Sequence, residues 1–451
     1  MSETRTLAEL AAHCADQVCA RGASAADAVV IESDSHGAGV RLREVENVEF
    51  CRERRLGLRC FDGHASAIAS TADLGEDALD HFLDEVLAMA RVLPDDEHAG
   101  LPEAAQLETA PPDLELAHEA DFDPDTDAAV ALAKRCEEAA LEHDPRIRNS
   151  EGASFSQSRT SVAYASSQGF RGSWSRTSSS LSVSPVAADD GGMQRDYWWD
   201  AGRKRADLES PEAIGRRAAE RAVRRLAPRR LATTRAPVIF EAPIAGSIAG
   251  HIASAICGGA LYRGMSFLRD KLDEPIASDL VTITDNARLP GGAASKPFDG
   301  EGLPTRSATI VDKGVLRSFL LDTYSARKLG MQSTGNAARS LGDAPAASPT
   351  NFHLAAGTRS LDEIIRDTGR GLLVTSLSGM GVNANTGDYS RGASGLWIED
   401  GAIAYAVEEI TIAGNLLDMC RAIDAVADDI RPRSGIAAPS LRISEMTIAG
   451  T

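Results

Sequence analysis

A short stretch soon after a strand-like segment holds the residues with the clearest bearing on chemistry. The segment 237–240 reads Pro-Val-Ile-Phe, and the hexapeptide GSIAGH at residues 246–251 then opens an apolar helix. His251 is a possible metal ligand, but a hydrolytic zinc needs at least three protein ligands and a general base for the attacking water. One imidazole supplies neither set, so these residues favour a hydrogen-bonded packing histidine.

Ser325 and Lys328 form an SxxK pattern, which in some hydrolases pairs a serine nucleophile with a lysine base. Neither a second lysine motif nor a GxSxG turn accompanies the pair. The spacing is common by chance, so an ordinary helix surface is the favoured interpretation. An independent hydrolase that uses Ser325 and Lys328 stays open as an alternative.

Four carboxylates lie in or near a glycine-rich region: Asp388, Glu399, Glu408 and Glu409. Paired carboxylates can hold a metal ion or exchange protons. Carboxylates beside glycine turns more often accept turn hydrogen bonds or lie exposed on strands. The second interpretation is favoured, and a hydrolase that uses the carboxylates near Glu408 is the alternative.

The glycine-rich region from 379 to 419 predicts short strands with accessible edges. Its short apolar runs are separated by glycines, which suit tight turns and the close approach of another chain. Asp400-Gly401 predicts a hairpin turn between two of these strands. A surface of this kind suits an extended peptide that forms hydrogen bonds along a strand edge. The glycines are at 379, 381, 387, 392, 395, 401 and 414.

An arginine-rich helix is predicted over residues 209–230, with Ser210 as N-cap and Pro211 in the first turn. One interpretation is a nucleic-acid patch. The other is a solvated face whose arginines meet an acidic linker. The formal net charge of −19 opposes binding to a phosphate backbone, so the second is favoured and no nucleic-acid partner is expected. The arginines are Arg216, Arg217, Arg221, Arg224, Arg225, Arg229 and Arg230.

Bulk properties narrow the class of protein. The chain has 451 residues, 43% hydrophobic and 25% charged, as expected for a globular protein with two or three domains. Its N-terminus lacks the apolar core of a secretory signal, and no apolar run approaches the roughly 20 residues that cross a bilayer. Seven scattered cysteines form no CxxC pair. A cytoplasmic protein with free thiols and no membrane partner is expected.

Three units are predicted. Residues 1–110 form a small N-terminal α+β domain with an acidic linker. It has helices at 6–21 and 79–90 and strands at 28–32, 39–51 and 57–70. Residues 111–232 form a β-rich central domain, with a helix near 127–143 and a meander over 150–183. Residues 233–451 form a larger C-terminal domain, a mixed β-sheet with glycine-rich strands. The fold class is α+β.

The chain resembles the TldD/PmbA family, within it the PmbA (TldE) branch. The matching segments keep the family's order and cover most of the length. They are residues 266–268 (SFL), 298–302 (FDGEG), 324–330 (YSARKLG), 333–336 (STGN), 379–391 and 408–416 (EEITIAGNL). The resemblance implies a cytosolic metallopeptidase that acts on unfolded peptides or flexible leader segments.

The resemblance also implies that catalysis lies elsewhere. TldD-type subunits carry an HExxxH helix and a later cysteine that hold zinc. On this sequence the two histidine positions fall at Gly246 and His251, and the glutamate position falls at Ser247. No cysteine occurs in the segment 433–440. The resemblance therefore implies a chain without catalytic or metal-binding residues that is inactive alone and relies on zinc held by a TldD-type partner.

An extended, unfolded peptide is the substrate implied for such a complex. The hypothesis places it along residues 379–391 and the neighbouring strand edges. Two other classes stay open: a binder of DNA gyrase, as the older name "modulator of DNA gyrase" suggests, and a homodimeric peptide binder without a catalytic partner. The candidate substrate-binding residues are Asn383, Asn385, Asp388, Tyr389, Arg391 and His251.

The geometry of a regular helix bears on how the HExxxH motif holds zinc. Residues five apart on a regular helix lie about 140° from one another. Catalytic members must therefore widen the helix locally, as a π-type turn does, to bring both histidines to one ion. With Gly246 and Ser247 present, an ordinary helix capped by Ser247 is expected here.

Overall fold

One long, curved antiparallel sheet organises the first half of the chain. The computed structural model describes residues 5–450 and confirms a mixed α+β fold. The strand order is β3-β2-β1-β4-β5-β6, and β7 also pairs with β5. The strands are β1 (Ala25–Arg41), β2 (Glu44–Asp62), β3 (Ala65–Thr71), β4 (Ile147–Ser166), β5 (Arg171–Asp189), β6 (Gly192–Arg195) and β7 (Trp198–Gly202).

Alternation along β1 explains how this sheet is covered. Side chains such as Ala28 and Ala38 face the packing helices, whereas Val29 faces the C-terminal half of the chain. The helices are α1 (Leu7–Ala20), α2 (Glu76–Ala90), α3 (Thr126–Leu141) and α4 (Pro211–Val223). The predicted cap at Ser210 is confirmed, because its side chain accepts a hydrogen bond from the Ala213 N–H.

Strand lengths in this half differ from the prediction. The predicted strands 39–51 and 57–70 each cross a hairpin turn, at residues 42–43 and 63–64. The predicted meander over 150–183 is a single hairpin of two strands, each close to 20 residues long. The linker from 94 to 127 has only short 3-10 turns before α3 begins, at Ala104–Gln106 and Glu119–Asp121; a third such turn lies at Arg205–Asp207.

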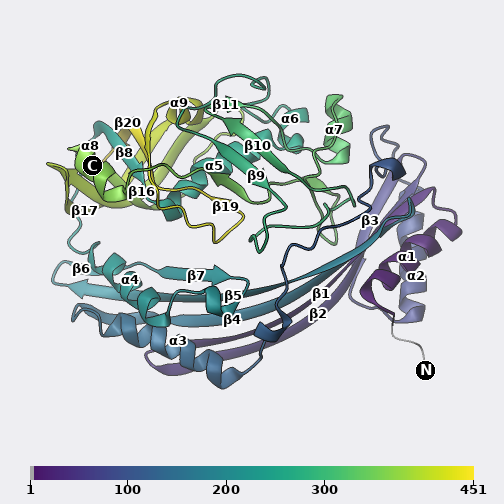
Figure 1. The fold of residues 1–451 in the computed structure, drawn as a ribbon, viewed down its shortest axis with the longest axis horizontal. Coiled ribbons are helices and arrows are strands. Elements are labelled where there is room, and N and C mark those ends of the chain that lie inside the picture. Colours follow the sequence, from purple (N-terminus) through teal and green to yellow (C-terminus); the bar gives the residue numbers. More distant parts are fainter. Residues whose placement is uncertain (1–4, 451) are drawn as a thin grey trace.

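The C-terminal half lies on the concave side of the curved sheet (Figure 1). It contains a six-stranded sheet in the order β17-β16-β15-β8-β20-β18 and a smaller one in the order β11-β10-β9-β14-β19. The first comprises β8 (Thr234–Phe240), β15 (Gly371–Ser378), β16 (Asp388–Glu399), β17 (Ala402–Asn415), β18 (Ile423–Val426) and β20 (Leu441–Ala449). The second comprises β9 (Ile283–Asn286), β10 (Ser307–Asp312), β11 (Val315–Leu316), β14 (Phe352–Leu354) and β19 (Ile436–Ala437). The predicted turn at Asp400-Gly401 joins β16 to β17, and both residues have positive φ.

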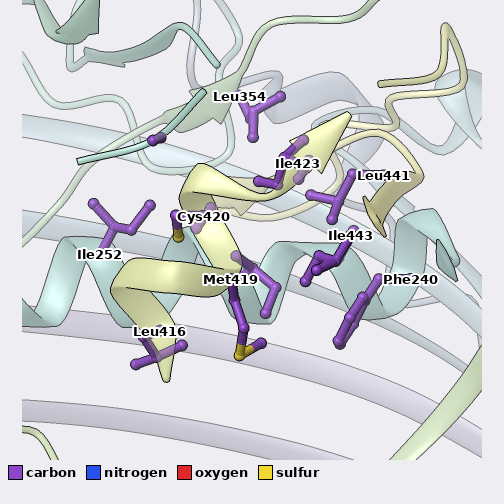
Figure 2. Packing of buried hydrophobic residues seen from close by; sticks show 14 of the residues in the cluster. Phe240, Ile252, Leu354, Leu416, Met419, Cys420, Ile423, Leu441 and Ile443 are labelled. Carbon is purple, nitrogen blue, oxygen red and sulfur yellow. The ribbon is translucent and has the colours of Figure 1, made fainter. Parts of the chain in front are cut away.

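Helix α5 (Ala242–Ile256) lies at the centre of this half. Ile252 of α5, Phe240 of β8 and Met419, which follows β17, belong to one large apolar core (Figure 2). The other elements here are α6 (Gly258–Tyr262), α7 (Thr323–Leu329), α8 (Leu361–Thr368), α9 (Leu416–Arg421) and the short pair β12 (Ala337–Ala338) and β13 (Ala346–Ala347).

The curved sheet runs across the first predicted boundary. Strand β1 pairs with β4 over fourteen residue pairs, from Asp27–Ser166 to Val40–Ala153, so the first two predicted units share one sheet. The boundaries at 110 and 232 stay predictions. No helix within residues 5–450 has the length and apolar composition needed to span a bilayer.

Candidate functional site

Helix α5 carries the degenerate motif, and it begins earlier than expected. It starts at Ala242 with Glu241 as N-cap and Pro243 in its first turn, so the predicted cap at Ser247 is wrong. Ser247 lies inside the helix, and its hydroxyl donates a hydrogen bond of 2.7 Å to the Ile244 carbonyl. The helix is regular throughout and contains no π-type turn.

The three motif positions line three different cavities. Gly246 lines a cavity of 370 Å³ together with the segment 429–438, and a Cβ at 246 would lie 3.6 Å from the Ile436 carbonyl oxygen. Ser247 lines a cavity of 690 Å³ beside β15. His251 lines a third cavity, of 220 Å³, with Phe267. A regular helix thus separates positions that a metal site must bring together.

His251 packs against an aromatic residue of β16. Its ring lies 6.0 Å from the Tyr389 ring in an edge-to-face arrangement. The buried His251 Nε2 has no hydrogen-bond partner within residues 5–450. Burial, and to a lesser extent the nearby Arg391, lowers the pKa of His251, so the imidazole is neutral at pH 7. Burial also raises the pKa of Tyr389 to about 12.

This donor set does not fit zinc. Position 246 offers no side chain, Ser247 is engaged with its own helix, and His251 alone faces Tyr389. Cys420, the last cysteine, is buried in the apolar core (Figure 2). Within residues 5–450, no group of three His, Cys, Asp or Glu side chains is close enough to hold a metal ion.

A free strand edge lies next to α5. Strand β8 pairs with β15 only from Leu372 to Val374 and then ends at Phe240, where the chain turns into α5. Within the described residues no strand pairs with residues 375–378 on that side. Residues 375–377 line the 690 Å³ cavity together with Ser247 and Arg391. Unpaired main-chain groups along a cavity can bind an extended peptide by strand addition.

The predicted substrate-binding residues divide into two groups. Asn383, Asn385 and Asp388 lie exposed on the loop before β16 or at the start of that strand. The Asn383 side chain accepts a hydrogen bond from the Asn385 N–H, and Asp388 accepts one from Thr386.

The second group comprises His251, Tyr389 and Arg391, which the structure brings toward α5. Tyr389 is buried against His251, and Arg391 donates to the Gly379 carbonyl and lines the 690 Å³ cavity. The loop itself folds back on β16, because the Ser390 N–H donates to Gly381 O at 2.7 Å. The substrate-binding role of all six residues stays a prediction.

Ser325 and Lys328 do not form a catalytic pair. The Ser325 hydroxyl is buried and donates to Asp322 in a capping box at the start of α7. The Lys328 ammonium points elsewhere and forms an ion pair of 3.2 Å with Asp96. Each group has a structural partner, but Ser325 is buried and does not lie on the helix surface that the sequence favoured.

The four carboxylates of the glycine-rich region likewise do not gather at one site. Asp388 bonds Thr386, Glu399 accepts from the Trp397 indole, and Glu408 accepts from the Gln194 amide. Each of these three therefore has a different partner on strand or turn surfaces. Glu409 adopts a positive φ of 55° inside β17.

Two arginines at the C-terminal end of α4 form ion pairs, but with other acids than expected. Arg221 forms ion pairs of 2.7 Å with Glu241 and 3.3 Å with Asp196, and Arg224 pairs with Glu241 at 2.9 Å. Arg221 is buried, so the prediction of a solvated face that meets the linker is wrong for it. The arginines instead connect α4 to the N-cap of α5.

Sequence reasoning missed the free edge at residues 375–377 and the cavity residues Tyr197 and Arg225. Residues 372–377 read Leu-Leu-Val-Thr-Ser-Leu, an ordinary buried strand. What makes its end accessible is the point at which β8 stops, which is a property of another segment. No local signal in the sequence reports it.

Added histidines test the separation of the motif positions. Gly246→His is expected to leave zinc affinity unchanged, because residues five apart on a regular helix lie about 140° from one another. Ser247→His places two imidazoles four residues apart on one helix face, where they can share an ion. We expect at least tenfold tighter zinc binding for Ser247→His than for Gly246→His, measured by equilibrium dialysis. Tighter binding by Gly246→His would show that the helix rearranges.

Comparison with known proteins matches one family along most of the chain. Profiles of the PmbA/TldA metallopeptidase family match domain 1 at residues 26–90, the central domain at 119–226 and the C-terminal domain at 233–450. Metalloprotease PmbA of Escherichia coli O157:H7 is 40% identical over 446 residues, which cover 99% of this chain and 97% of that protein. A metalloprotease TldD homolog of Haemophilus influenzae matches less, at 28% identity over 41% of this chain and 42% of its own length.

Solved structures show the same fold over nearly the whole chain. A crystal structure from Bacteroides thetaiotaomicron VPI-5482, whose name refers to a modulator of DNA gyrase, has a TM-score of 0.90 and 29% identity over 98% of each chain. TldE from Thermococcus kodakarensis has a TM-score of 0.86 and 22% identity, covering 97% of this chain and 99% of its own. The chain therefore belongs to the PmbA/TldD metallopeptidase family.

Proposed function

We propose that this chain is the PmbA/TldE-type, zinc-less subunit of a cytoplasmic TldD/TldE metallopeptidase. In this proposal a TldD-type partner holds the zinc and performs hydrolysis. This chain binds the unfolded peptide substrate next to the partner's active site. The full-length similarity to PmbA, against a partial match to a TldD homolog, supports the assignment to this branch.

The observation that carries the proposal is the arrangement around α5. The helix that would hold zinc in a catalytic subunit is regular, and its motif positions line separate cavities. The largest of these cavities lies beside the free edge of β15. These observations support a chain that binds an extended peptide and relies on a partner for the metal.

Strand addition accounts for a preference for unfolded substrates. A peptide laid along residues 375–378 would extend the sheet where β8 ends, and Arg391 lies at the same cavity. Main-chain hydrogen bonds depend little on sequence, and a folded protein has few free strand edges to offer. This mode predicts broad sequence tolerance together with rejection of folded proteins.

Reconstitution with a partner tests the assignment. This chain is mixed with a TldD-type protein and zinc, and cleavage of an unstructured peptide is followed by mass spectrometry. We expect cleavage by the mixture well above that by either chain alone, and a stable complex of both chains by native mass measurement. A mixture no faster than the TldD-type protein alone would contradict the subunit role.

A bulky side chain at position 247 tests the peptide groove. Ser247→Phe is expected to fill the cavity beside residues 375–377 and to raise the KM of the reconstituted enzyme at least tenfold, with little change in kcat. Ser254→Phe is the matched control, because Ser254 is exposed on the same helix and lines only the smaller cavity of His251; it should leave KM within twofold. Equal KM values for the two variants would place the peptide elsewhere.

A further inference from the structure

The cavity beside Gly246 is lined by an unusual set of groups. Trp198 of β7 lies among four guanidinium groups, whose centres are 4.6 to 5.4 Å from its ring. The Trp198 side chain is 5% exposed, and its indole N–H has no acceptor within residues 5–450. A buried donor without a partner is costly, which marks this position as one that a bound acceptor would satisfy. The four arginines are Arg217, Arg221, Arg431 and Arg433.

Arg217 is the cation of this set that lacks a partner. Arg221 pairs with Glu241 and Asp196, Arg431 pairs with Glu209, and Arg433 pairs with Asp200 and Glu209. Arg217 has neither an ion pair nor a hydrogen bond to any described residue, and it lines the cavity. Desolvation and the neighbouring Arg431 lower its pKa, as expected for a guanidinium without a counter-charge.

The charges around the cavity leave a positive excess. Three arginines and two carboxylates line the cavity, in a chain whose formal net charge is −19. One of the carboxylates, Asp429, already accepts hydrogen bonds from the Ser440 N–H and hydroxyl. The arginines are Arg217, Arg431 and Arg433, and the carboxylates are Glu241 and Asp429. An anionic group is the ligand that these charges favour.

The position of the cavity suggests which anion it receives. Tyr197 and Pro243 line both this 370 Å³ cavity and the 690 Å³ groove beside residues 375–377. The two cavities are therefore neighbours, and residues of α5, α8 and the segment 429–438 line the smaller one. The smaller volume suits the end of a peptide.

We propose that the cavity beside Gly246 binds the C-terminal carboxylate of the peptide substrate, with Arg217 and the Trp198 indole N–H as its anion-binding groups. This inference rests on the proposed role in peptide binding and adds the chemical class of the substrate's end. It gives the cavity at the first motif position a use that needs no metal. It also gives a role to Arg217, which has no acid as its partner.

Three peptides test the proposal on the full chain without a partner. They are an N-acetylated alanine-rich pentapeptide with a free C-terminus, the same peptide as its C-terminal amide, and the amide with glutamate as its last residue. Binding is followed by the fluorescence of Trp198 and Trp199, which line the cavity. We expect the free acid to bind about tenfold more tightly than the plain amide.

Arg217→Gln should reduce the preference for the acid over the amide to within twofold. Arg216→Gln is the matched control, because Arg216 is also exposed on α4 but lines a different cavity. Equal binding of acid and amide by the wild type, or no binding of either, would overturn the proposal. If the glutamate amide binds as tightly as the free acid, the cavity recognises acidic side chains, and the proposal of a C-terminal carboxylate is overturned. The reconstituted complex can cleave peptides even if the free acid and the amide bind equally. Failure of the carboxylate proposal can therefore be told apart from failure of the proposed subunit role.

Discussion

Replacing Asp27 with asparagine is expected to lower the free energy of unfolding by about 3–5 kcal/mol, because it leaves buried cations without their anion. Asp27 is fully buried on β1, where Arg59 of β2 donates to it at 2.5 Å and Arg339 forms a second ion pair. The Tyr164 hydroxyl donates to the same carboxylate at 3.1 Å. Asparagine keeps the shape of the side chain and removes only its charge.

The effect should be large because this cluster joins the two halves of the molecule. Asp27 and Arg59 belong to the curved sheet, whereas Arg339 and the neighbouring Glu301 belong to the C-terminal half. If the chain unfolds as one unit, a melting temperature lower by roughly 3–5 °C is expected in calorimetry.

Asp16→Asn is the matched control for this substitution. Asp16 forms an ion pair of 3.0 Å with Arg171, and both side chains are more than half exposed. Exposed pairs contribute at most about 1 kcal/mol, and salt screens them. The control should therefore change the melting temperature by about 1 °C or less. Equal effects of the two substitutions would show that the buried cluster contributes no more than a surface pair.

Local signals account for the parts of the fold that the sequence predicts well. Ser210 followed by Pro211 marks the start of α4, and Thr6 forms a capping box with Glu9 at the start of α1. Asp400-Gly401 marks the turn between β16 and β17. Each signal acts through the hydrogen bonds or φ angles of neighbouring residues, so the resulting local structure depends little on contacts with distant parts of the chain.

The start of α5 shows how a local signal can be misread. Ser247 resembles an N-cap, but Pro243 already occupies the first turn, where its missing N–H costs nothing. Glu241, the actual cap, makes no side-chain capping bond and pairs instead with Arg221 and Arg224. These partners come from another helix, and the sequence alone does not place them together.

The candidate site depends almost wholly on distant contacts. The resemblance to a family locates the motif positions Gly246, Ser247 and His251, but their separation into three cavities follows from the regular helix and the segments that pack around it. The edge of β15 is accessible because β8 stops at Phe240. Periodicity along one strand does not report where its neighbour ends.

Glu301 is a buried carboxyl whose environment predicts a dependence of stability on pH. It is 1% exposed and accepts a hydrogen bond of 2.9 Å from the Thr323 N–H. Burial is the largest cause that raises its pKa, to about 7; Asp299 raises it further, and Arg59 opposes the rise. The other charged groups in this buried region are Asp27, Arg339 and Lys296.

A carboxyl with a raised pKa in the folded state stabilises the protein at low pH. Its contribution is complete below the unfolded pKa of about 4.5 and is lost as the pH rises through about 7. For a shift of this size the loss between pH 5 and pH 8 is about 2 kcal/mol, at 1.36 kcal/mol per pKa unit. Glu301→Gln stays neutral and can keep the bond from Thr323, so it should not suffer this loss.

The melting temperature of Glu301→Gln relative to wild type should therefore rise by roughly 2 °C between pH 5 and pH 8. Measuring the variant against wild type at each pH cancels the titration of all other groups. Glu46→Gln, at an exposed position of β2, should show the same offset at both pH values. If the difference in melting temperature between Glu301→Gln and wild type is the same at pH 5 and pH 8, Arg59 keeps Glu301 ionised in the folded protein. The cluster that joins the two halves would then contain two paired anions at pH 5 as well as at pH 8.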